Sequence, residues 1–372
     1  MTKKTILSLI VFLMVFTTIG LILWLVNMGL KYRYDQRFLN AMLDKRLIYL
    51  RNLPPNAQLT YNSKDMQAPD SFAVEAKDYP CTTDSFGFIV SGTMHQQPDL
   101  KFVFSGGSIP QSLYTDEEKR MPAAVAAGVE KLSGLKINVW NCAAGGTNSQ
   151  HTLNVLSNAV LQLKPDYAFF YGNINDVATL AHYGTFYNTN LRWGTFFNIR
   201  EFDRINRPSS SKILPYIQQA VQSGLKLNPI QDDFAEVRDS ILVIDTLLLR
   251  AEVVRVYKTM MAVCKANDIQ PVLITQVNLY HRLDYDWVKK NMPQAMMTEA
   301  GYENLVKAFD YYNDILRQLA MEEKVMLIDL SATDFDFSDF NDPSHFNANG
   351  YLKASRIVAK QFSEKAHIAL KP

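Results

Sequence analysis

The chain has little of what builds a metal-stabilised or disulfide-bonded protein. Its 372 residues include only three cysteines, Cys81, Cys142 and Cys264. They are widely separated and form no CxxC pair, so the sequence predicts neither a zinc site nor a disulfide framework. A single Cys81–Cys142 disulfide stays open for a chain that folds in an oxidising compartment.

The chain also lacks an excess of charge of one sign, with 38 Lys and Arg against 37 Asp and Glu. Binding to a phosphate backbone draws on clustered positive charge, so the composition argues against nucleic acid as a partner. The motifs GxxxxGK[ST] and GxGxxG are absent, which argues against a nucleotide site. Hydrophobic residues make up 48% of the chain, enough for a large globular core.

A long uncharged run stands at the N-terminus. Residues 5–30 (TILSLIVFLMVFTTIGLILWLVNMGL) carry no charge, and about 20 apolar residues span a bilayer. A cleaved signal peptide would show a shorter apolar region and a small-residue cleavage site. We therefore expect residues 1–30 to be a single-pass anchor that holds the protein in a membrane. Basic residues flank both ends of the run, so charge alone leaves the orientation open.

Beyond residue 100, short apolar runs alternate with longer helical patterns. Such runs are typical of buried parallel strands joined by right-handed helical crossovers. The sequence therefore predicts an α/β fold, a three-layer α/β/α sandwich around a parallel sheet. The predicted strands are 101–104, 136–140, 167–171, 271–275 and 325–330, and the predicted helices are 116–132, 149–163, 240–266, 302–322 and 351–366.

We expect residues 31–99 to form a linker and accessory segment that packs on a main domain, residues 100–372. An insertion near 177–239 is long for a connection in such a fold, and long loops are often functional. Its aromatic residues either stack on sugar rings or pack into the core, and core packing is the favoured alternative for most of them. They are Tyr183, Phe186, Tyr187, Trp193, Phe196 and Phe197.

Three predicted strands end in glycine-rich or polar segments. The first enters FSGGS with Ser108 at the turn, the second enters NCAAGGTNS with Gly146, and the third enters GNIND with Asn175. In parallel sheets the chemistry lies outside the carboxyl ends of the strands. Glycine lets a backbone N–H approach a ligand, and an Asn amide can donate to a developing oxyanion. Each segment also fits an ordinary turn or helix cap.

A carboxylate and an imidazole follow the fifth strand in the segment DPSH. Asp342 and His345 are three residues apart, so the carboxylate can reach the imidazole Nδ1–H and leave Nε2 to accept a proton. A serine hydroxyl is inert until such a base takes its proton, which connects this pair with Ser108. Metal binding is the alternative use, but no third ligand stands at matching spacing. We expect no metal and no cofactor.

Taken in order, FSGGS, NCAAGGTNS, GNIND and DPSH resemble the four sequence blocks of the SGNH/GDSL hydrolase superfamily. The resemblance covers about residue 101 to the C-terminus. It looks most like the membrane-anchored bacterial branch, in which a GGS block precedes an E..R.P element, here DEEKRMP. It implies a flavodoxin-like parallel sheet in an SGNH hydrolase-like catalytic domain.

The resemblance also implies a role for each block. Ser108 would be the nucleophile, His345 the general base and Asp342 its orienting acid. The oxyanion hole would be made by the N–H groups of Ser108 and Gly146 and by Asn175 Nδ2.

The chain departs from the common blocks at three positions. Gly107 stands where GDS has Asp, as in the GGS branch. Ala143 and Asn173 stand where the second and third blocks often have glycine. The last two changes bear on the geometry of the oxyanion hole more than on the Ser–His–Asp set.

The implied activity is a serine-dependent ester hydrolase or O-acyltransferase that works through an acyl-serine. The same residues serve water and sugar acceptors, so hydrolysis and transfer both stay open. Anchored relatives mostly act outside the bacterial cytoplasmic membrane, often on acylated cell-envelope polysaccharides. This implies an acylated carbohydrate substrate and an extracytoplasmic (periplasmic) domain. A catalytically silent polysaccharide-binding or assembly factor and a lipid or thioester hydrolase stay open. His281 and Arg282 are further candidate substrate contacts.

Overall fold

The computed structural model describes residues 3–43, 46–48, 50–63, 75, 77–172, 174–188, 193–198, 244–291 and 298–368. The chain divides into two compact units. One comprises Met1–Leu47 and Phe196–Lys226, and the other comprises Ile48–Thr195 and Leu227–Pro372. The boundaries predicted near residues 30 and 99 stay predictions.

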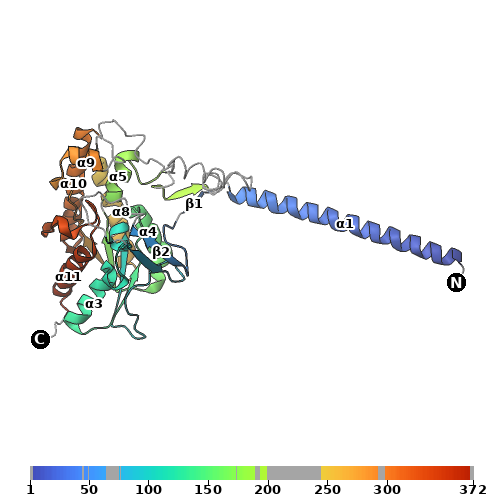
Figure 1. Cartoon of the computed structure of the whole chain (residues 1–372), viewed down its shortest axis with the longest axis horizontal. Coiled ribbons are helices and arrows are strands. Elements are labelled where there is room, and N and C mark those ends of the chain that lie inside the picture. Colours follow the sequence, from blue (N-terminus) through green and yellow to red (C-terminus); the bar gives the residue numbers. More distant parts are fainter. Residues whose placement is uncertain are drawn as a thin grey trace. The chain divides into compact units, whose positions relative to one another are not determined.

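The first unit contains one long helix, α1 (Lys3–Leu43), drawn in blue in Figure 1. Within its stretch Lys3–Tyr34, an 18-residue window reaches a mean hydropathy of 2.8, and none of that window is buried. By length and composition the helix can cross a membrane. Two short strands, β1 (Arg46–Ile48) and β7 (Phe196–Asn198), pair with each other.

The second unit is built on a five-stranded parallel sheet in the order β5-β4-β6-β8-β9. Counted along the chain this is the order 2-1-3-4-5 of flavodoxin-like sheets, in which the connections change direction between β4 and β6. The predicted α/β class and all five predicted strands are confirmed. The strands are β4 (Leu100–Gly106), β5 (Ile137–Asn141), β6 (Tyr167–Tyr171), β8 (Gln270–Ile274) and β9 (Met326–Ile328).

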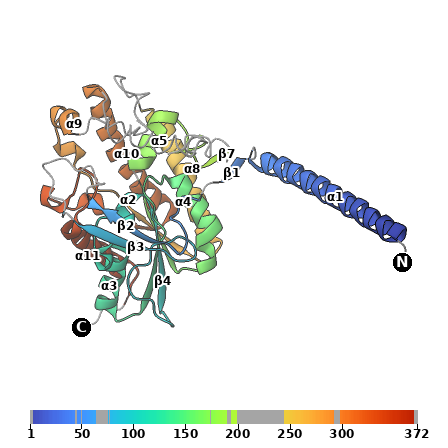
Figure 2. The same cartoon turned by 45° about the vertical axis from the view of Figure 1, so that its right-hand side comes forward.

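Helices cover both faces of this sheet. Because successive strand residues point to opposite faces, Phe104 packs with α3 (Met121–Ser133) and α11 (Ala348–Lys365). Its neighbour Val103 packs on the opposite face, in the cluster that holds α4 (Ser149–Val155), α8 (Thr246–Lys265) and α10 (Glu299–Glu323). Figure 2 shows α3 and α11 side by side. The predicted three-layer sandwich is the observed architecture.

Helix starts coincide with capping residues. Helix α10 begins after Thr298, whose Oγ1 accepts from Gly301 N at 3.1 Å. Asp245 caps α8 and Asn347 caps α11 in the same way.

The predicted helix 149–163 consists of α4 followed by η3 (Leu156–Val160) and η4 (Leu161–Leu163). Elements not predicted individually are β2 (Gln58–Asn62), β3 (Asp78–Thr82), α2 (Ser108–Gln111), η2 (Glu117–Lys119), α5 (Ile174–Tyr183), η6 (Tyr280–Arg282), α9 (Tyr285–Asn291), η8 (Leu330–Ala332) and η9 (Phe337–Asp339).

The structure shows the state of two cysteines and the burial of several aromatic side chains for which the sequence left alternatives open. Cys81 and Cys142 are buried free thiols, so no disulfide joins them. Phe186 and Trp193 are buried, at 0% and 2% exposure, as core packing predicts. Tyr187 is 54% exposed, and the Arg255 Cζ lies 4.8 Å from its ring centroid. Residues 199–239 of the predicted insertion, like Asn173, lie outside the described residues.

Candidate active site

Ser108 stands where strand β4 turns into the short helix α2. Strands β4 and β6 approach so closely here that a Cβ at Gly106 would overlap the Tyr171 carbonyl, and Gly106 has a φ of 153°. Only glycine fits both conditions. The chain therefore turns sharply and places the partly exposed Ser108, the first residue of α2, at the carboxyl edge of the sheet.

The imidazole of His345 lies between this serine and a carboxylate. Its Nε2 is 2.6 Å from Ser108 Oγ, and its Nδ1 is 2.6 Å from Asp342 Oδ2. Both ring nitrogens are thus engaged, which fixes the plane of the ring. The structure brings together the three residues that the sequence predicted to work together, in the order serine, imidazole, carboxylate.

The other oxygen of Asp342 is held by its own loop. Oδ1 accepts from the backbone N–H groups of Ser344 and His345, each at 2.8 Å, and from Ser344 Oγ at 3.0 Å. Burial alone would raise the pKa of this carboxyl, but the His345 charge and these hydrogen bonds outweigh it and hold the pKa below its usual value. Ser344 was not singled out from the sequence, although it lies inside DPSH.

The carboxylate in turn acts on the imidazole. Burial lowers the pKa of His345, but the charge of Asp342 and its hydrogen bond raise it by more, so the net pKa lies above 6.5. Side-chain exposures of 29% for His345 and 18% for Asp342 leave the pair reachable from solvent. Above its pKa, the ring presents a neutral Nε2 to the serine hydroxyl, as a general base must.

The glycine-rich loop after β5 borders the same corner. Its Ala144 N–H donates to Gly106 O at 3.1 Å, and Gly146 has a φ of 72°, which favours glycine. Among the described residues, no acceptor contacts the N–H of Ser108 or of Gly146. Both N–H groups are therefore candidate donors for an oxyanion.

Asn175 reaches this corner from α5. Its Nδ2 donates to Thr147 O at 3.0 Å, and a Cβ at Gly107 would lie 2.5 Å from that nitrogen. Glycine rather than the aspartate of the GDS block therefore leaves room for the amide in this chain. The second N–H of the Asn175 amide remains a candidate donor at the site.

Asp176 follows Asn175 in α5 and is fully buried, at 0% exposure. Its Oδ1 accepts from Ser149 N at 2.6 Å and its Oδ2 accepts from the Tyr312 hydroxyl at 2.9 Å. Burial raises the pKa of the Asp176 carboxyl to about 6, against these hydrogen bonds. One carboxyl thus ties the starts of α4 and α5 to α10. From the sequence, Asp176 fits only a turn or cap.

A pocket of about 240 Å³ adjoins the serine and the imidazole. Apolar side chains make up part of its wall, so it suits a small apolar group. Its lining consists of Ser108, Gln111, Leu113, Tyr114, Asn341, Asp342, His345, Phe346 and Tyr351.

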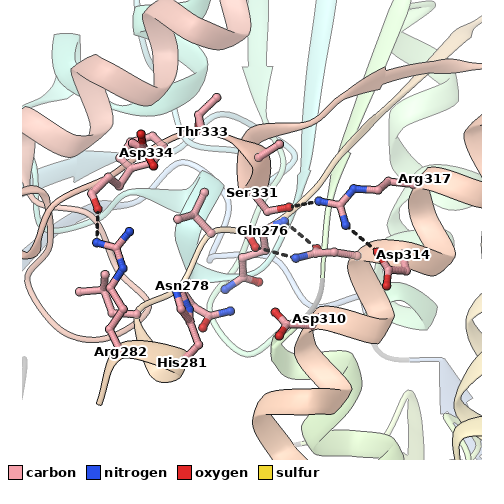
Figure 3. Close-up of a pocket in the computed structure, with 15 residues that line it drawn as sticks. Gln276, Asn278, His281, Arg282, Asp310, Asp314, Arg317, Ser331, Thr333 and Asp334 are labelled. Carbon is pink, nitrogen blue, oxygen red and sulfur yellow. Dashed lines mark hydrogen bonds and ion pairs between the residues drawn. The ribbon is translucent and has the colours of Figure 1, made fainter.

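A second cavity, of about 340 Å³, lies beyond the ends of β8 and β9 (Figure 3). His281 and Arg282 line this cavity and not the pocket at Ser108. Arg282 Nη1 donates to Phe335 O at 2.8 Å, and Figure 3 shows Arg317 between Asp314 and Ser331. The structure therefore does not place the two predicted substrate contacts beside the serine.

One further sequence feature does not line the pocket at Ser108. The arginine of DEEKRMP, Arg120, is fully buried and donates to the Pro80 carbonyl, joining the start of α3 to β3. Within the described part of the chain, no group of three or more His, Cys, Asp or Glu side chains is placed to hold a metal ion. The groups gathered at Ser108 are a hydroxyl, an imidazole and a carboxylate, which serve acid–base chemistry.

No family model and no curated protein matches the chain. Among solved structures, it is similar to LAE5, an alpha/beta hydrolase enzyme from the metagenome of Lake Arreo, Spain, with 14% identity over 74% of this chain and 99% of that one, at a TM-score of 0.40. A catalytic mutant of Axe2, an acetylxylan esterase from Geobacillus stearothermophilus, shows 14% identity over 73% and 95% of the two chains, at a TM-score of 0.40.

The acetyl xylan esterase AlAXEase shows 17% identity over 72% of this chain and 99% of that one, also at a TM-score of 0.40. These likenesses are remote. The geometry around Ser108 is stronger evidence for a function than these likenesses.

Proposed function

We propose that the chain is a serine ester hydrolase or O-acyltransferase of the SGNH/GDSL type. Ser108 is the nucleophile, His345 the general base and Asp342 the acid that orients the ring. One observation carries the proposal: His345 Nε2 lies 2.6 Å from Ser108 Oγ while its Nδ1 lies 2.6 Å from Asp342 Oδ2. A hydroxyl, an imidazole and a carboxylate in this order activate a serine on unrelated folds.

The reaction follows from these positions. His345 Nε2 takes the proton of Ser108 Oγ as the oxygen attacks an ester carbonyl, and the carbonyl oxygen becomes an oxyanion. The N–H groups of Ser108 and Gly146 and the Asn175 amide stabilise this charge. His345 then gives its proton to the departing alcohol, which leaves an acyl-serine. Water or a sugar hydroxyl, deprotonated by the same imidazole, attacks the acyl-serine. His345 then returns this proton to Ser108 Oγ as the acid or the acylated sugar leaves.

The proposed substrate is an acylated carbohydrate of the bacterial cell envelope. The pocket of about 240 Å³ beside Ser108 supports a short acyl group rather than a long lipid chain. The apolar helix α1 supports a location at the cytoplasmic membrane, and we place the catalytic domain on its outer, periplasmic side.

Covalent labelling of the full-length chain in detergent tests the proposal. A fluorophosphonate probe modifies only an activated serine, and peptide mass spectrometry locates the adduct. We expect an adduct on Ser108 that is lost in Ser108→Ala and in His345→Ala. Ser157→Ala, at an exposed position in η3, should label like the parent. A folded parent chain without an adduct contradicts the proposal and favours the catalytically silent binding domain.

A further inference from the structure

Arg51 contacts the glycine-rich loop from outside the sheet. It belongs to the segment that precedes the predicted catalytic domain, 94 positions before its partner Gly145. Its Nε donates to Gly145 O at 2.9 Å, and a Cβ at Gly146 would lie 2.6 Å from its Nη2. The guanidinium therefore lies directly against both glycines, and any side chain at Gly146 would displace it.

The contact acts on one particular peptide group. The carbonyl of Gly145 and the N–H of Gly146 belong to the same planar trans peptide and point in opposite directions. A hydrogen bond that fixes the carbonyl therefore also fixes the direction of the N–H. Because the donor is a cation, the bond is strong and polarises the peptide, which makes the N–H a better donor.

This N–H is one of the donors proposed for the oxyanion hole. No described residue accepts it. The loop that carries it is bonded to the Ser108 corner through Ala144 N and Gly106 O, at 3.1 Å. A Cβ at Gly145 would lie 3.2 Å from Gln111 Oε1, on the helix that begins with Ser108. Arg51 therefore holds the loop on one side, and residues of β4 and α2 contact it on the other.

We infer that Arg51 is a positioning residue of the active site, which orients and polarises the Gly146 N–H toward the oxyanion. This inference rests on the proposed function and deepens it. Arg51 acts through the Gly145–Gly146 peptide and does not touch the substrate. The segment before the predicted catalytic domain thereby supplies a residue that acts on the active site.

Steady-state kinetics on the full-length chain in detergent test the inference, with p-nitrophenyl acetate as the probe ester. We expect Arg51→Gln to lower kcat roughly 10- to 100-fold and to leave KM within about twofold, because the oxyanion exists only in the transition state. Arg51→Lys keeps a charged donor and should recover part of kcat. The matched control Arg250→Gln alters a partly exposed arginine bonded to Gln318 and should leave kcat unchanged.

Hydrogen exchange of the peptide that contains residues 144–148 supplies a second readout. Faster exchange in Arg51→Gln, at an unchanged melting temperature, supports a local effect on the loop. Wild-type kcat in Arg51→Gln overturns the inference, as does a loss of kcat that only follows a loss of folded protein. A parent chain that neither hydrolyses the ester nor labels at Ser108 overturns the proposed function instead.

Discussion

The Oγ of Ser108 lies 2.6 Å from Nε2 of His345, although 237 positions separate the two residues. The loop that carries His345 follows β9 at one edge of the sheet, whereas Ser108 follows β4. A hydrogen bond from Leu279 N to Pro343 O, at 2.7 Å, holds that loop against the segment that follows β8. The end of β4 therefore fixes Ser108, and a hydrogen bond between two loop segments holds the residues next to His345.

The pH dependence of kcat/KM should report the state of His345. Only the neutral ring accepts the serine proton, and Asp342 raises the pKa of the ring above 6.5, so activity should fall as pH drops through a midpoint above 6.5. Asp342→Asn removes that charge; the midpoint should move to lower pH and kcat should fall on the order of 10⁴-fold. Asp314→Asn, 65% exposed, is the control. An unchanged midpoint in Asp342→Asn would refute this role.

Asn175 should act on the transition state alone. Asn175→Ala removes a donor that costs about 10²- to 10³-fold in kcat at comparable oxyanion holes, with little change in KM. Asn158→Ala changes an exposed amide that donates to Asn154 O at 2.8 Å and should have no effect. Steady-state kinetics of both variants test this role. A kcat of Asn175→Ala within twofold of the parent would show that Asn175 does not contribute to the oxyanion hole.

Asp176 should make stability depend on pH. Its pKa of about 6 lies above the ordinary 3.8, so between these values the folded chain binds a proton that the unfolded chain releases. The free energy of unfolding should therefore fall by about 3 kcal/mol as pH rises from about 4 to above 6. Asp176→Asn should flatten this slope, as measured by denaturant unfolding at pH 5 and pH 7.5. Equal slopes in both proteins would contradict the prediction.

The small pocket should limit the acyl chain. We expect kcat/KM for p-nitrophenyl acetate to exceed that for the decanoate ester by at least about tenfold, because a short acyl group matches the pocket of about 240 Å³ more closely than a ten-carbon chain does. Leu113→Ala widens the wall of this pocket and should raise the decanoate-to-acetate ratio. A parent chain that prefers decanoate would favour the lipid or thioester hydrolase.

Helix α1 should hold the protein in the membrane. In bacterial cells, the full-length chain should stay with carbonate-washed membranes, and deletion of residues 1–30 should release it. Added protease should digest the catalytic domain in spheroplasts if this domain is extracytoplasmic. A full-length chain in the soluble fraction would contradict the anchor, and a protected domain would reverse the orientation.

Local patterns predicted the features that depend on neighbouring residues. A buried strand needs a run of apolar side chains, which is why 167–171 coincides with β6 (Tyr167–Tyr171). The pair Asp342 and His345 is three positions apart, close enough for its hydrogen bond to form within one turn. The short helices α2 and α5 escaped prediction because glycines and polar residues dominate their starts.

The burial of Asp176 and the contact of Arg51 could not be predicted without the arrangement of the elements in space. Asp176 has a caplike sequence context, and only the approach of α4 and α10 buries it under Ser149 N and the Tyr312 hydroxyl. Arg51 stands in a segment without a motif, and its contact with Gly145 spans 94 positions.

The sequence by itself thus determined the apolar N-terminal helix, the alternation of strands and helices, and the local Asp–His pair, because each depends on burial or spacing along the chain. The four blocks predicted that Ser108 and His345 work together, but only the tertiary structure gave the 2.6 Å contact between them. It also kept His281 and Arg282 out of the pocket at Ser108 and brought Arg51 against the Gly145–Gly146 peptide. Contacts between distant segments depend on the folded path of the whole chain, and no local pattern encodes that path.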